Sequence, residues 1–146
     1  MKQVVQSKGS YLQVLAVFCA MAAFLLSGCA TRAKFQNSTV VPAATGDVKV
    51  TKDNNNNYKI SIDIENLAEP NRLPEPQNVY VVWADTPNGI QSLGQLKVDK
   101  GFISGKLKAS LETSIPYKPT RIFITGENTA SVSYPGRYVV LNTSSF

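Results

Sequence analysis

The 146-residue chain contains no histidine, and this absence excludes several kinds of catalytic site. Ser-His-Asp and Cys-His arrangements both need an imidazole base, and histidine is also the commonest metal ligand in proteins. No Ser-x-x-Lys spacing occurs, and Ser104 lacks the flanking glycines of a Gly-x-Ser-x-Gly nucleophile turn. We therefore expect a protein that is not an enzyme and that holds neither a metal ion nor a cofactor.

Cysteines and long apolar runs are scarce as well. The chain has only Cys19 and Cys29, so residues 30–146 cannot form a disulfide and must be stabilised by packing. The apolar run from Val14 to Leu26 has 13 residues without a charge, whereas a membrane-spanning helix needs about 20. This length suits a signal sequence better than a permanent span.

The N-terminal region has the parts of an export signal. Lys2 and Lys8 give it a basic start, the apolar run follows, and small residues precede a cysteine. The residues that end the run are Leu26, Ser27, Gly28 and Cys29. This tetrapeptide resembles the bacterial lipobox, in which an aliphatic residue and two small ones precede an invariant cysteine.

The lipobox resemblance implies that a signal peptidase cleaves before Cys29 and that the Cys29 sulfur carries a diacylglycerol group. A further acyl chain on the new amino terminus would make the membrane attachment stable. The alternatives are an ordinary cleaved signal and an uncleaved anchor. Ala30 stands where aspartate would signal retention in an inner membrane. We therefore expect a lipid-anchored protein of the bacterial cell envelope, on the periplasmic or surface face of the outer membrane if the source is Gram-negative.

Composition divides the chain into a signal peptide over residues 1–28, a lipidated tether over 29–46 and a folded domain over 47–146. The tether is rich in Ser, Thr, Ala and Asn and lacks a sustained period, which indicates a flexible linker. Beyond it, apolar and polar residues alternate as they do in strands. The expected strands cover 47–51, 58–65, 79–84, 90–98, 102–111, 121–125 and 138–141. Seven strands without a helix predict an all-β, Ig-like or fibronectin type III-like sandwich.

The part of the chain from Val79 onward resembles the extracytoplasmic domain of anti-sigma-K-type factors. The residues that carry the resemblance are Tyr80, Trp83, Gly89, Ser92, Leu93, Gly94, Thr125, Gly126, Glu127, Pro135 and Gly136. The family's sigma-binding helical domain and membrane span have no counterpart here. The resemblance therefore implies the same sandwich outside the cytoplasmic membrane, and not sigma-factor inhibition.

Aromatic residues in loops and in the last strand are candidates for a binding patch. Tyr117, Tyr134 and Tyr138, together with Phe146, either cluster at the surface or pack into the domain. Trp83 lies on a strand that is apolar on both faces, so we expect it in the core and not in a ligand groove.

Acidic and amide residues offer two further candidate sites, and both have a simpler explanation. Asp53, Asn55 and Asn57 imitate the first ligands of a calcium loop, but the later positions lack the required glycine and glutamate, so a hairpin turn is favoured. Asp63 and Glu65 point to one face of a strand, which fits a solvated face better than a glycosidase acid pair.

The mature chain would carry a net charge near +3, because Lys2 and Lys8 leave with the signal. Lys97, Lys100, Lys106 and Lys108 are interleaved with Asp99 and apolar residues, as on the solvated face of a hairpin, although anionic lipid or wall polymer could attract them. An exported lipoprotein does not meet nucleic acid. We therefore expect a membrane-anchored binding module whose partner is an envelope protein or a cell-wall component. The alternative is a structural spacer or a subunit of a larger assembly.

Overall fold

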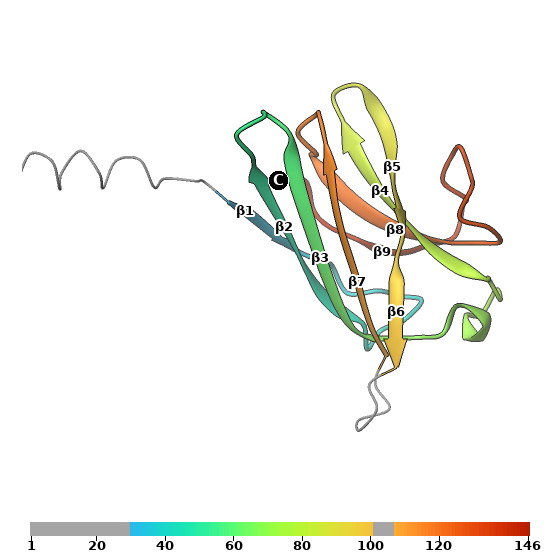
Figure 1. Ribbon diagram of the computed structural model, residues 1–146. Helices are drawn as coiled ribbons and strands as arrows, with labels where there is room; N and C mark the ends of the chain where they lie inside the picture. Colours follow the sequence, from blue (N-terminus) through green and yellow to red (C-terminus); the bar gives the residue numbers. More distant parts are fainter. Residues whose placement is uncertain (1–29, 101–106) are drawn as a thin grey trace, which may run out of the picture.

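A computed structural model describes residues 30–100 and 107–146, and within them nearly all of the regular secondary structure is β-strand (Figure 1). Two antiparallel sheets pack face to face, which confirms the predicted all-β sandwich. The strands are β1 (Thr31–Lys34), β2 (Thr45–Lys52), β3 (Tyr58–Leu67), β4 (Val79–Thr86), β5 (Gly89–Gln95), β6 (Lys97–Lys100), β7 (Leu107–Ile115), β8 (Arg121–Glu127) and β9 (Val139–Asn142). A single turn of 3-10 helix, η2, covers Pro70–Arg72.

The five-stranded sheet has the order β1-β2-β3-β7-β6, and the four-stranded sheet has the order β5-β4-β8-β9. Apart from β1, this is the ABED and C′CFG arrangement of an Ig-like sandwich. The described residues form nine strands, whereas the sequence predicted seven. One additional strand is β1. The other arises because the predicted strand over 90–98 divides at Leu96 into β5 and β6, which belong to different sheets.

The core lies between the two sheets, and β3 shows why alternation predicts it. Ile60, Ile62 and Ile64 are fully buried, while Lys59 and Asp63 on the other face are exposed. Burying each isoleucine contributes roughly 1.5–3 kcal/mol. The facing sheet supplies apolar side chains of its own, namely Val82, Ala84, Ile122 and Ile124.

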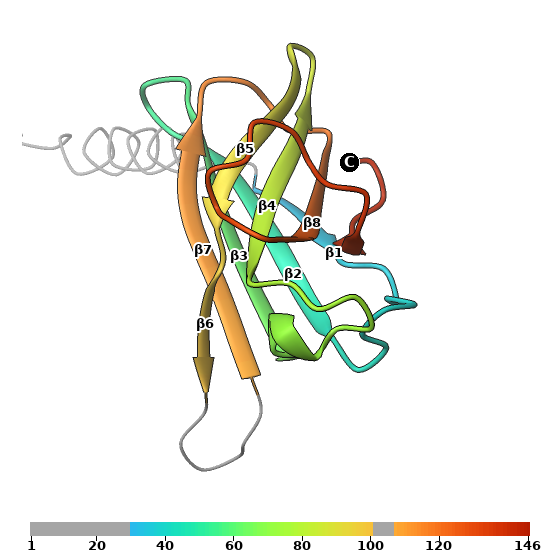
Figure 2. The same ribbon diagram turned by 90° about the vertical axis from the view of Figure 1, so that its right-hand side faces the viewer.

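The two central strands of the four-stranded sheet, β4 and β8, are buried on both faces. On the outer face of the sheet Val81, Trp83 and Phe123 form a second apolar cluster, against which Val132 packs. The segment between β8 and β9 crosses over this face (Figure 2). A strand that packs against the core on one side and a loop on the other must be apolar at every position, which explains the uninterrupted apolar run of β4.

The segment predicted as a flexible linker, 29–46, is largely part of the domain. Thr31–Lys34 form β1, which pairs with β2, and Phe35, Val41 and Ala44 are buried in the core. Ser38 Oγ donates a hydrogen bond to the Val140 carbonyl oxygen at 2.5 Å. The prediction of a flexible linker was wrong because β1 is only four residues long, which is too short to show the alternation of a strand. Only Ala30 separates Cys29 from the first strand in the sequence.

Among residues 30–100 and 107–146, no helix is long and apolar enough to cross a membrane.

Candidate binding groove

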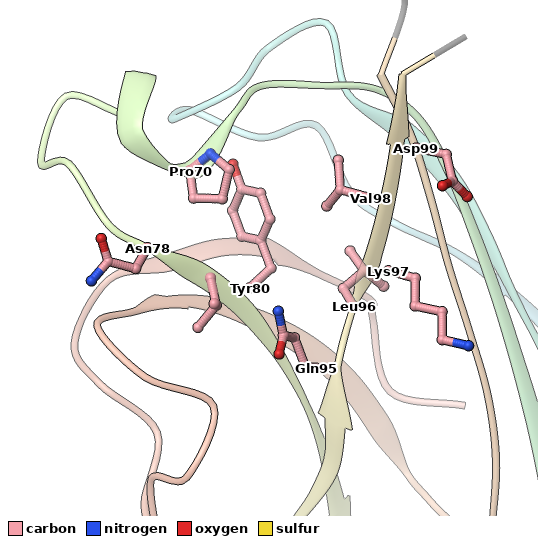
Figure 3. A pocket seen from close by; sticks show the side chains of 9 residues that line it. Pro70, Asn78, Tyr80, Gln95, Leu96, Lys97, Val98 and Asp99 are labelled. Carbon is pink, nitrogen blue, oxygen red and sulfur yellow. The ribbon is translucent and has the colours of Figure 1, made fainter.

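A groove of about 590 Å³ opens between the start of β4 and strand β6 (Figure 3). We call it the β4–β6 groove. It is lined by Pro70, Asn78, Val79, Tyr80, Gln95, Leu96, Lys97, Val98 and Asp99.

The groove exists because one stretch of chain changes sheets. Up to Leu96 this stretch pairs with β4, and the last contact is the Leu96 N–H, which donates to the Tyr80 carbonyl oxygen at 3.0 Å. Beyond Leu96 it pairs with β7 instead and becomes the edge strand of the five-stranded sheet. The two backbones therefore diverge, and the space between them is open on one side.

Apolar side chains form the floor of the groove. Tyr80 and Leu96 are buried, and Val98 is 36 % exposed. Figure 3 shows Val98 and Pro70 beside the Tyr80 ring, whereas Lys97 points to the other side of β6. Alternation along a strand produces this division, so the groove has an apolar floor, and Lys97 and Asp99 add charged groups to its lining.

A hydrogen bond from its hydroxyl group fixes the position of the Tyr80 ring. Its hydroxyl donates a hydrogen bond to the Ala68 carbonyl oxygen at 2.9 Å. Burial raises the pKa of Tyr80 well above its ordinary value, and the nearby Tyr138 raises it further. The ring, fixed by this hydrogen bond, offers the groove an apolar face.

The lining of the β4–β6 groove combines apolar, amide and charged side chains. Its side chains hold no pairing of a nucleophile with a base, and within residues 30–100 and 107–146 no three acidic, cysteine or histidine side chains gather as metal ligands. An edge strand next to an apolar trough suits an extended peptide, which can pair with the strand and place alternate side chains in the trough.

The structure does not bring the predicted tyrosine patch together. Tyr138 packs against the core, and its hydroxyl accepts a hydrogen bond from the Glu75 N–H at 3.4 Å. Phe146 also packs against the core. Tyr134 is 83 % exposed in the loop after β8, and Tyr117 is 45 % exposed in the loop before it. Since β8 has seven residues, about 20 Å separates its ends at 3.3 Å per residue.

Two of the sequence interpretations are confirmed. Trp83 is buried, as expected. The predicted turn at Asp53 is present, and its Oδ1 accepts hydrogen bonds from the Asn55 and Asn57 N–H groups at 2.8 and 2.9 Å. Asn56 adopts a φ of 63°, in the left-handed region that asparagine tolerates.

The sequence contained one signal for the groove that composition alone did not reveal. Gly94 lies inside the predicted strand over 90–98, and it adopts a φ of 116° next to a register shift between β4 and β5. An isolated glycine in a strand often marks a bulge. The irregularity precedes Leu96 by two residues, at the point where the chain leaves its β4 partner.

No protein-family model, curated protein or solved structure matches this chain. The predicted cleavage and lipidation residues, Leu26, Ser27, Gly28 and Cys29, lie outside the described residues.

Proposed function

We propose that this protein is a lipid-anchored binding module of the bacterial envelope, attached to its membrane through Cys29 and without enzymatic activity. The tetrapeptide Leu26, Ser27, Gly28 and Cys29 follows an apolar run of signal length, which supports export and acylation. The folded domain begins at Thr31, so the anchor would connect to it almost directly.

The β4–β6 groove is the observation that favours binding over a purely structural role. A spacer needs only a stable sandwich, whereas this domain leaves the edge of β6 open beside Tyr80, Leu96 and Val98. We propose that the ligand is an extended segment of an envelope protein, which adds to β6 as a further strand.

Metabolic labelling with radioactive palmitate tests the anchor. The wild-type chain should take up label, and Cys29→Ala should take up none, because no other cysteine follows the signal. Equal labelling of the two proteins would contradict acylation at this residue.

A photo-crosslinking amino acid placed in the groove tests the binding role. With the crosslinker at Val98, illumination of intact envelopes should give a discrete adduct. The control carries the crosslinker at Ile90, which is 54 % exposed and lies near the β4–β5 turn, away from the groove. A purely structural spacer would give no adduct from Val98, or the same adducts from both positions.

A further inference from the structure

Three basic side chains lie on one face of the sheet where the chain enters the domain. Arg32 and Lys34 lie on β1, and Lys49 lies on the adjacent strand β2. All three are exposed. We call this group the basic edge, because β1 is the outermost strand of the five-stranded sheet.

Two of these cations face each other directly. The register pairs Arg32 with Lys49, whereas Lys34 is opposite Asp47. Like charges opposite one another in a sheet are destabilising. Within residues 30–100 and 107–146, neither Arg32 nor Lys49 forms an ion pair. The nearest acids on this face, Asp47 and Asp63, lie two register pairs further along the strands. This unfavourable pair is consistent with a function that needs both positive charges.

The basic edge lies within a few residues of the proposed anchor. Arg32 follows Cys29 by three residues, so the chain between them reaches at most about 11 Å. The negative potential of an anionic membrane decays over a Debye length, about 8 Å at physiological ionic strength. The groove strand β6 is the opposite edge of the sheet, about 19 Å from β1 at 4.8 Å per strand.

We propose that the basic edge binds the headgroups of anionic phospholipids and holds the β1 side of the domain against the membrane. This inference rests on the proposed acylation of Cys29. Acyl chains alone would leave the domain free to rotate about Ala30, whereas the cations fix one orientation. In that orientation the β4–β6 groove faces away from the membrane and is accessible to a partner.

Site-specific labelling of the full-length lipidated protein tests this orientation. The mature chain has no cysteine besides the acylated Cys29, so Asn54→Cys and Glu75→Cys each provide one labelling site. Asn54 lies in the β2–β3 turn near the basic edge, and Glu75 lies in the loop between η2 and β4. Energy transfer from each label to acceptor-labelled headgroups is measured in vesicles of phosphatidylcholine, with and without phosphatidylglycerol.

We expect stronger transfer from Asn54 than from Glu75, with a larger difference when phosphatidylglycerol is present and a smaller one when the salt concentration is raised. Each basic residue near an anionic surface contributes about 1 kcal/mol, so each removed charge should lower the ratio of docked to free domain about fivefold. The variant Arg32→Gln/Lys49→Gln should therefore lose most of the phosphatidylglycerol effect. The control Arg72→Gln/Arg137→Gln removes one arginine from η2 and one from the β8–β9 loop, both distant from the basic edge, and should retain it.

The variant Lys49→Glu distinguishes a loss of membrane docking from a loss of folding stability. It places an acid opposite Arg32, so it should raise the midpoint of thermal unfolding while it weakens docking. If Lys49→Glu docks like the wild type, or if the distant control weakens docking equally, the proposal is wrong. A protein that does not take up palmitate at Cys29 would instead contradict the proposed function.

Discussion

The substitution Thr125→Val removes the centre of a buried hydrogen-bond chain that fixes the loop over the four-stranded sheet. Trp83 Nε1 donates to Thr125 Oγ1 at 2.8 Å, and Thr125 Oγ1 donates to Glu127 Oε1 at 2.6 Å. The Gly136 N–H donates to the same Glu127 oxygen at 2.7 Å. Thr125 and Glu127 are both buried, so water cannot replace these partners without opening the loop.

The expected loss follows from the groups that valine leaves without a partner. A buried donor such as the Trp83 N–H costs about 1–3 kcal/mol when unsatisfied, and a hydrogen bond to a charged acceptor contributes about 1.5–3 kcal/mol. Because Glu127 keeps its bond from Gly136, we expect a combined loss of about 3 kcal/mol. For a domain of this size that corresponds to about 10 °C in the unfolding midpoint.

The assay is urea and thermal unfolding of the full-length chain, followed by the fluorescence of Trp83, its single tryptophan. The native emission should also shift to the red, because the loop over Trp83 loosens. Thr113→Val is the control, since Thr113 is half-buried on β7 and outside this hydrogen-bond chain. If Thr125→Val lost no more stability than Thr113→Val, the assigned role of the hydrogen-bond chain would be refuted.

Three other substitutions give expectations of different size. Gly46→Ala should lower the free energy of unfolding in urea by about 1–3 kcal/mol, because a Cβ at this position would lie 2.5 Å from the Asp63 carbonyl oxygen. An unchanged free energy of unfolding would contradict this packing. Tyr80→Phe should lower the free energy of unfolding by about 1 kcal/mol at neutral pH, because it removes the hydrogen bond from the Tyr80 hydroxyl to the Ala68 carbonyl oxygen. Burial raises the folded-state pKa of Tyr80, so the wild type should lose stability above about pH 10, where the unfolded tyrosine ionises and the folded one does not. Tyr80→Phe should lose less stability over this alkaline range. An equal loss in the two proteins would contradict the raised pKa. Lys59→Ala breaks an exposed ion pair with Glu112, 3.4 Å long, and should change stability by under about 0.5 kcal/mol, and a larger change in thermal unfolding would contradict that estimate.

Much of the sandwich could be predicted because the order of apolar and polar residues along each strand reflects which of its faces are buried. β3 alternates because one face packs in the core and the other faces solvent, and β4 is apolar from Val79 to Ala84 because both of its faces are covered. The hairpin turn at Asp53 could also be predicted from the sequence, since the Asp53 side chain accepts hydrogen bonds from backbone N–H groups of the same turn.

The parts that escaped prediction depend on contacts between distant residues. β1 is held by pairing with β2, and the Phe35–Thr143 bridge joins it to the other sheet. Neither contact leaves a periodic pattern in residues 30–46. The change of sheets at Leu96, which creates the groove, likewise depends on β7 accepting β6 as a neighbour. The resemblance to anti-sigma-K-type factors stays a prediction.

Mass spectrometry of the mature N-terminal peptide tests the central claim most directly. After export, trypsin should release Cys29–Arg32 carrying the mass of a diacylglyceryl group and a further acyl chain, since Arg32 is the first basic residue after the predicted cleavage site. Recovery of an unmodified peptide that contains Cys29 together with residues of the signal would contradict the lipid anchor, and with it the orientation proposed for the domain.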